Sequence, residues 1–153
     1  MKLVIPIEPV EQQRPRIRKG GRGLYDPKKV RDFKKEVAEY VRQQDFSKFE
    51  DKALNVKVKF YRQVQNSISK KERELRLSDV HRPIVKPDLD NYTKSILDAL
   101  NSILWDDDAK IVHAELDKIY SEKPRIEIKV EEWSEQYGNA RQETNHDVSA
   151  KRE

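Results

Sequence analysis

The apolar residues of this chain recur at two spacings, and these spacings limit the folds that the chain can adopt. Helical spacing predicts a helix that begins at Asp26-Pro27, with Asp26 as the N-cap and Pro27 in the first turn, and ends near Arg42. The positions that set it are Val30, Phe33, Val37 and Val41. A second helix is predicted over 88–102, where the apolar side is formed by Leu89, Tyr92, Ile96, Ala99 and Leu100.

Alternation of apolar and polar residues predicts four strands, over 2–7, 54–61, 111–120 and 124–133, with a basic loop over 11–24. Strands and helices are interspersed, so we expect a single α/β or α+β domain over 1–133 with about two main helices. The charged stretch 67–80 has two interpretations, a short amphipathic helix or a mobile insertion. Residues 134–153 are poor in apolar residues, and we expect them to form a disordered tail.

Composition excludes several classes of protein. The absence of cysteine excludes disulfides, iron–sulfur clusters and thiol nucleophiles, and it fits a reducing cytoplasm. Three scattered histidines argue against a histidine-based zinc site. No apolar run approaches the roughly 18 residues of a membrane-spanning helix. We therefore expect no membrane as a partner. Glycine-rich phosphate-binding and dinucleotide-binding motifs are also absent, so we expect no organic cofactor.

Charged residues are segregated along the chain, although the net charge is only +4. Residues 14–35 and 62–86 are mainly basic, whereas 88–117 is mainly acidic. Basic segments suit a polyanionic partner, and the acidic segment would repel it unless a cation lay among the carboxylates. Mg²⁺ prefers carboxylate oxygens, so the pattern indicates a metal-dependent enzyme acting on a phosphate backbone. The alternative is that these segments are ordinary solvated faces.

The segment 86–94, Lys-Pro-Asp-Leu-Asp-Asn-Tyr-Thr-Lys, carries the most specific chemistry. On a helix, Asp90, Lys94 and Asp98 project from one side, because they are four residues apart. An acidic turn, 106–108, follows Trp105 and enters the next predicted strand. If that turn folds back beside the helix start, three or four carboxylates converge with one lysine, which would form a Mg²⁺ site.

Each of these residues also has a structural interpretation. Asp88 and Asp90 could cap the helix, Lys94 could pair with Asp90 or Asp98 one turn away, and the acidic turn could simply be exposed. A calcium-binding EF-hand loop is excluded, because Thr93 stands where that loop requires glycine.

The same residues resemble the RusA family of Holliday-junction resolvases. The resemblance rests on the segment 86–94, on Asp-Ala-Leu-Asn at 98–101 and on Trp-x-Asp-Asp-x-x-Ile-Val at 105–112, and it covers about residues 2–132. Arg14-Pro15-Arg16 and Tyr25-x-Pro27 are also similar to the family. The three consecutive aspartates leave the register of the Asp-Asp pair open by one residue, and 63–82 has no clear counterpart.

The resemblance implies a small mixed sheet and a homodimeric, Mg²⁺-dependent endonuclease that cuts four-way DNA junctions in recombination and repair, with Mn²⁺ as a substitute metal. It implies that the catalytic residues are Asp88, Asp90, Lys94 and Asp108. The implied metal ligands are Asp88, Asp90 and Asp108, with Asp107 beside them. Phosphate contacts are expected from the basic residues Arg14, Arg16, Arg18, Lys19, Arg22, Lys70, Lys71, Arg73 and Arg76.

We further expect a cytoplasmic, nucleoid-associated protein encoded by a bacterium or a prophage. Two alternatives stay open: a catalytically silent protein that binds DNA junctions, and a regulatory partner in a recombination complex. Cleavage by the purified protein would distinguish the enzyme from both.

Overall fold

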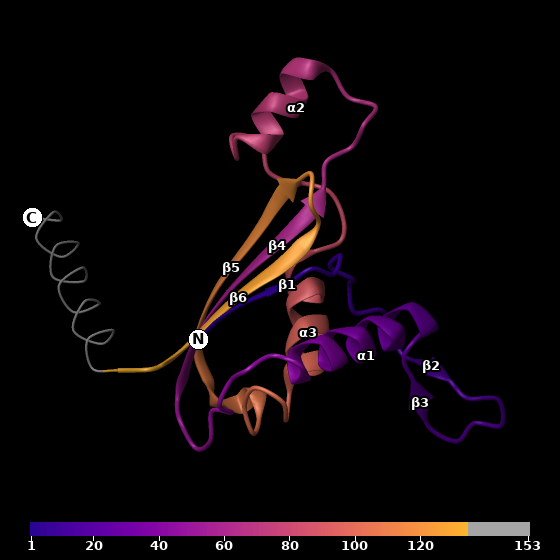
Figure 1. The fold of residues 1–153 in the computed structure, drawn as a ribbon. Coiled ribbons are helices and arrows are strands. Elements are labelled where there is room, and N and C mark those ends of the chain that lie inside the picture. The colour runs from indigo at the N-terminus through magenta and orange to yellow at the C-terminus, as the bar shows by residue number, and fades with distance from the viewer. Residues whose placement is uncertain (135–153) are drawn as a thin grey trace, which may run out of the picture.

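A four-stranded mixed sheet lies at the centre of the computed structural model, which describes residues 1–134 (Figure 1). Its order is β1 (Lys2–Ile5), β6 (Arg125–Glu132), β4 (Leu54–Gln63) and β5 (Ile111–Ser121). The β4 and β5 strands are parallel, whereas β6 is antiparallel to both of its neighbours. The expected mixed sheet is thus confirmed. The expected tail lies outside the described residues except for Ser134.

Two helices, α1 (Lys28–Arg42) and α3 (Leu89–Leu100), contact each other and cover one face of the sheet (Figure 1). The apolar positions predicted for α1 are buried in this layer, and the rings of Phe60 on β4 and Tyr92 on α3 stack with centroids 5.3 Å apart. The opposite side of β4 carries exposed or half-buried Lys57 and Lys59. The fold is therefore a single α+β domain of two layers, as expected from the order of elements.

The parallel pairing of β4 with β5 requires a long crossover, because parallel neighbours cannot be joined by a tight turn. This crossover holds α2 (Lys70–Leu77), then α3, then the short 3₁₀ turn η1 (Asp108–Lys110). The α2 helix lies beyond one end of the sheet, while α3 runs back along the sheet to the other end (Figure 1). The crossover therefore carries the whole segment that the sequence marked as chemically informative.

The structure corrects two local predictions, for the strand 2–7 and the loop 11–24, and it decides between the two interpretations of 67–80. The first strand ends at Ile5 because Pro6 has no N–H for the ladder. The expected loop 11–24 contains a hairpin of two short strands, β2 (Arg16–Ile17) and β3 (Leu24–Tyr25). The stretch 67–80 is helical over α2, which begins after Ser69, whose hydroxyl accepts a hydrogen bond from Glu72 N at 3.2 Å; no residue of α2 is fully buried. None of the helices in residues 1–134 is long and apolar enough to cross a membrane.

The predicted N-cap of α1 was wrong. Pro27 occupies the capping position, with φ −54° and ψ 151°, and its carbonyl accepts hydrogen bonds from Val30 N and Arg31 N. Asp26 instead binds Lys34 Nζ and Gln12 Nε2, each at 2.9 Å. The hydrogen bond from Lys34 holds the pKa of Asp26 below its usual value, although burial opposes it. The carboxylate therefore ties the chain before α1 to the helix about two turns further along.

This ion pair predicts a pH-dependent contribution to stability. Because the pKa of Asp26 is lower in the folded state, the stabilisation is present above the pKa of the unfolded chain and is lost as the pH falls through the folded pKa. We expect Asp26→Asn to destabilise the protein by about 1 kcal/mol at pH 7 and by much less near pH 3. Urea unfolding at both pH values measures this difference.

The matched control is Asp32→Asn, since Asp32 pairs with Lys28 at 3.2 Å but both side chains are largely exposed. This variant should change the stability by only a few tenths of a kcal/mol. An equal loss at pH 7 and pH 3 for Asp26→Asn would contradict the assignment.

Candidate active site

The start of α3 presents two exposed carboxylates, neither of which caps the helix. Asp88 stands at the N-cap with φ −69° and ψ 149°, yet its side chain accepts no capping hydrogen bond. Its nearest cation is Lys86 Nζ, 3.9 Å from Oδ2, and both side chains are more than half exposed. Among the described residues, the Asp90 side chain makes no ion pair or hydrogen bond. Neither side chain therefore caps the helix, which was the structural alternative for these two residues.

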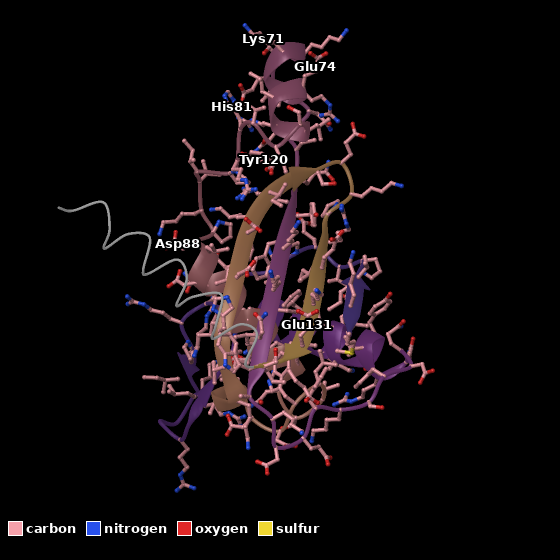
Figure 2. The ribbon with its side chains drawn as sticks, turned by 90° about the vertical axis from the view of Figure 1, so that its left-hand side faces the viewer. Lys71, Glu74, His81, Asp88, Tyr120 and Glu131 are labelled. Atoms are coloured by element: carbon pink, nitrogen blue, oxygen red, sulfur yellow. The ribbon has the colours of Figure 1, made fainter. Side chains whose placement is uncertain are left out.

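Two basic residues of the sheet hold the loop that carries Asp88. Lys118 Nζ, from β5, donates to the carbonyls of Val85 at 2.9 Å and Pro87 at 3.0 Å. Arg62, from β4, donates to the carbonyl of Lys86. Burial and the nearby Arg62 lower the pKa of Lys118, while Asp88 opposes them. Figure 2 shows Asp88 beside α3, on the side of the molecule where β5 forms the sheet edge. The loop is thus fastened to the sheet just before the helix.

Lys94 does not form the helical ion pairs that its spacing allows. Asp98 binds Lys34 of α1 instead, at 3.2 Å, and Lys34 also holds Asp26. Within the described residues, Lys94 makes no ion pair or side-chain hydrogen bond. Its ammonium group is exposed on the α3 face opposite to the buried Ile96 and is available for a ligand.

The three aspartates of the acidic turn have three different surroundings. Asp106 accepts a hydrogen bond from Asp51 N at 3.0 Å and pairs with Lys48 at 3.2 Å, and these contacts lower its pKa. Asp107 is the N-cap of η1 and accepts from Ala109 N at 2.9 Å. Asp106 is therefore committed to the loop around Asp51, which favours Asp107 and Asp108 as the pair that faces the site.

Asp108 lies within the electrostatic field of α3. Partial burial raises its pKa, the Asp107 and Asp98 carboxylates raise it further, and Lys94 opposes them. The sequence suggested that the acidic turn folds back beside the start of α3; in the structure it lies further along the helix, near Lys94 and Asp98. Two side chains fix the turn, since Leu104 and Trp105 have no exposed surface and Phe49 forms an isolated β-bridge with Trp105.

The carboxylates form two groups along one face of α3 rather than one cluster. Asp90 and Asp98 are eight residues apart, which corresponds to about 12 Å along a helix axis. In residues 1–134, no three His, Cys, Asp or Glu side chains lie close enough together to hold a metal ion. The donors are nevertheless hard oxygens, and the mutual repulsion that raises the pKa of Asp108 is what a divalent cation would relieve. The residues therefore fit Mg²⁺ by their chemistry.

The expected DNA-contacting residues fall into two sets. The side chains of one set are exposed: Arg14, Arg16, Arg18, Lys19 and Arg22 around the β2–β3 hairpin, and Lys70 and Lys71 on α2. Figure 2 shows Lys71 at the far end of α2, directed away from the sheet. The other set, Arg73 and Arg76, is half-buried and points back into the molecule.

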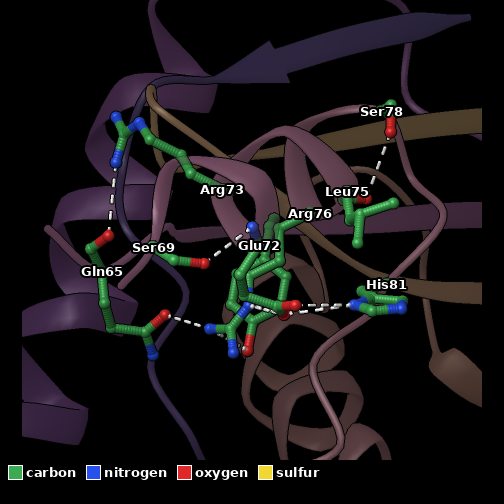
Figure 3. A network of polar contacts seen from close by, with 9 residues as sticks. Gln65, Ser69, Glu72, Arg73, Leu75, Arg76, Ser78 and His81 are labelled. Atoms are coloured by element: carbon green, nitrogen blue, oxygen red, sulfur yellow. Dashed lines mark hydrogen bonds and ion pairs between the residues drawn. The ribbon is translucent and has the colours of Figure 1, made fainter. Parts of the chain in front are cut away.

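Figure 3 shows the polar network that holds α2 in place. Arg76 donates to Glu72 at 2.7 Å and to the side chain of Gln65 at 2.6 Å, and its guanidinium lies 4.7 Å from the centre of the Tyr120 ring. Arg73 donates to the carbonyl of Gln65 at 3.2 Å and to Glu122 at 2.8 Å. Both arginines thus fix the insertion on the end of the sheet, whatever they contact in addition.

Sequence reasoning missed three residues that organise the site: Lys34, Arg62 and Lys118. Each lies on a different element from the carboxylates, so no spacing in the sequence could connect them. The one available signal was that Lys34 and Arg62 belong to the basic segments 14–35 and 62–86.

Comparison with known proteins gives two findings. A family model described as "Endodeoxyribonuclease RusA" matches residues 6–131, which is most of the chain. A Bacillus subtilis (strain 168) protein named "Uncharacterized protein YqaN" is 38% identical over 138 residues, which cover 88% of this chain and 97% of that protein.

The contacts of Lys118 predict a local effect of its removal. In Lys118→Met, the loop before α3 loses two hydrogen bonds to its carbonyls, which frees the start of α3 to fray. We therefore expect the amides of Tyr92 and Thr93, the first of which donates to Asp88 O at 3.2 Å, to exchange with solvent about tenfold faster. Hydrogen exchange followed by NMR measures this. Lys59→Met, on the exposed side of β4, is the control and should leave these amides unchanged. Unaltered exchange in Lys118→Met would show that the loop is held by other contacts.

Proposed function

The chain belongs to the RusA family of endodeoxyribonucleases, and on this basis we propose that it is a Mg²⁺-dependent resolvase of four-way DNA junctions. Membership in the family implies endodeoxyribonuclease activity in general. One observation carries the finer proposal. Asp90 and Lys94 are exposed and make no ion pair or side-chain hydrogen bond within residues 1–134, and the exposed Asp88 has only Lys86, 3.9 Å away. The neighbouring acidic residues Asp26, Asp98 and Asp106, in contrast, are paired with lysines of other elements.

In this proposal, Asp88 and Asp90 at the start of α3 and Asp108 of the acidic turn would hold one or two Mg²⁺ ions, and Asp107 would support Asp108. When bound, such an ion polarises a phosphate and lowers the pKa of a water molecule, and Mn²⁺ can replace it. Lys94 places its ammonium group against the scissile phosphate and stabilises the negative charge that develops there. Lys118 and Arg62 keep the Asp88 loop in position, while Lys34 holds Asp98 against α1.

The basic hairpin around β2–β3, together with Lys70 and Lys71, contacts the phosphates of the junction arms in this proposal. Such contacts position DNA without reading its sequence. Arg73 and Arg76 contribute indirectly, because they keep α2 oriented. A homodimer with twofold symmetry would present two such sites to a four-armed substrate of matching symmetry. The proposed setting is recombination and repair in the cytoplasm, at the nucleoid, with the gene carried by a bacterium or a prophage.

Cleavage of a fixed four-way junction tests the activity directly. We expect purified protein to cut the junction in the presence of Mg²⁺, at symmetrical positions, and to leave it intact in EDTA, because the carboxylates alone supply no electrophile. Denaturing gels with each strand labelled in turn measure this. Binding without any cleavage would support a silent junction-binding protein instead, and absence of binding would favour a regulatory partner.

Single substitutions on α3 test the assigned roles. Asp90→Asn and Lys94→Ala should each lower the cleavage rate by at least about a hundredfold while junction affinity changes little. Single-turnover cleavage and gel-shift titration measure the two quantities. Asp106→Asn is the matched control, since Asp106 is already bound to Lys48 and Asp51, and it should cut at a near-normal rate. Near-normal cleavage by Asp90→Asn or Lys94→Ala would overturn the assignment.

The same assay resolves the register of the acidic turn. We expect Asp108→Asn to lose more activity than Asp107→Asn, because the Asp107 side chain already accepts a hydrogen bond from Ala109 N, whereas Asp108 lies in the electrostatic field of Lys94. The reverse order would exchange the roles of the two residues.

A further inference from the structure

The β2–β3 hairpin projects from the body of the protein past the end of α1 (Figure 1). Its turn is stabilised by hydrogen bonds from Arg18 N to Gly23 O at 3.1 Å and from Gly21 N to Arg18 O at 3.0 Å. Gly21 has a φ of 73°, in the left-handed region, which allows the chain to reverse sharply. At the base of the hairpin, the guanidinium of Arg31 lies 5.8 Å from the centre of the Tyr25 ring. The hairpin therefore has a defined shape although it adds nothing to the core.

Two large aliphatic side chains lie opposite each other on this hairpin and are exposed. Ile17 pairs with Leu24 across the two strands, and their exposed fractions are 69% and 64%. Side chains directly opposite each other on a strand pair lie on one face, so together they form a small apolar surface. An isolated exposed aliphatic residue needs no explanation, but an exposed pair in the strands of a projecting hairpin, next to its turn, indicates a contact with something outside the fold.

The charge around this pair restricts what that contact can be. Residues 14–25 contain five basic residues and no acidic one. Their basic members are Arg14, Arg16, Arg18, Lys19 and Arg22. A second copy of the same hairpin would be repelled, whereas a polyanion would be attracted. The occupant favoured by charge is therefore DNA, in agreement with the proposed function.

DNA exposes the flat apolar faces of its bases only where base stacking is interrupted. In a continuous duplex, the phosphates and the groove edges are accessible while the flat faces of the bases are covered by their neighbours. At a branch point the stack is broken, and aliphatic side chains can enter between bases, as wedge residues do in proteins that kink DNA. Individual phosphates are present on both a junction and a duplex, so contacts to them supply affinity for either DNA.

We propose that Ile17 and Leu24 form an apolar wedge that contacts unstacked bases at the branch point, so that the hairpin distinguishes branched DNA from continuous duplex. This inference rests on the proposed function and adds to it a structural basis for substrate selection. The flanking arginines and lysines supply affinity for both kinds of DNA, while the aliphatic pair supplies the preference for the branched one.

The test compares two DNA substrates with the full-length protein in EDTA, so that the DNA stays intact. For Ile17→Ser/Leu24→Ser, we expect the dissociation constant for a fixed four-way junction to rise about tenfold, while that for a linear duplex of the same arm sequence changes less than about twofold. A 2-aminopurine base at the branch point reports unstacking: its fluorescence should rise with the unaltered protein and stay unchanged with the double variant.

Two further variants serve as controls. Val4→Ser removes an exposed aliphatic residue, 45% exposed, from the edge strand β1, and it should bind both DNAs normally. Arg16→Ala/Arg18→Ala should weaken binding to both DNAs by similar factors. The wedge is overturned if Ile17→Ser/Leu24→Ser binds the junction as tightly as the unaltered protein does, or if it loses affinity for junction and duplex equally. If the unaltered protein neither prefers nor cuts the junction, the proposed function itself fails.

Discussion

The burial of one side of α3 against the sheet determines what the opposite side presents to solvent. Tyr92, Ile96 and Leu100 are buried, and the Tyr92 ring stacks on Phe60 of β4. Because a helix repeats every 3.6 residues, this packing forces Asp90, Lys94 and Asp98 outward along a single stripe. The alignment of the candidate site is thus a consequence of core packing. A rotation of α3 by half a turn would bury these charges, which the free energy of desolvation forbids.

Charge compensation then selects which acidic groups remain available. Lys34 neutralises Asp26 and Asp98, Lys48 neutralises Asp106, and Lys110 binds the exposed Asp51 at 2.9 Å. At the candidate site, Asp90 and Asp108 have no lysine of residues 1–134 within ion-pair distance, and Asp88 has only the exposed Lys86, 3.9 Å away. The pKa of Asp108 is raised by partial burial and by its acidic neighbours. Because Lys34 compensates the charge of Asp98, the carboxylates of Asp98 and Asp108 can both lie near Lys94.

Sequence patterns predicted the elements that have a strong period of their own. The α1 and α3 helices and the strands of the sheet appeared near their observed bounds, because apolar spacing reflects burial on one face. Two elements were missed or left open. The β2–β3 hairpin was missed because its strands are only two residues long, too short for a visible alternation. The α2 helix was left open because it is held by contacts of Arg73 and Arg76 with β5 and the turn after it, rather than by an apolar face. Asp26 has the sequence signature of an N-cap, but a lysine two turns into α1 binds it instead.

Sequence alone determined the chemistry of the candidate site: Asp88, Asp90, Lys94 and the Asp107-Asp108 pair are present at spacings that match one family, and helical periodicity places three of its charges, Asp90, Lys94 and Asp98, on one face. Tertiary structure decided which of them are available, because ion pairs and hydrogen bonds across elements depend on distances that spacing does not encode. It turned Asp98 toward Lys34 and Asp106 toward Lys48, and it fastened the Asp88 loop through Lys118. Those contacts join residues up to 64 positions apart, and only the folded chain brings them together.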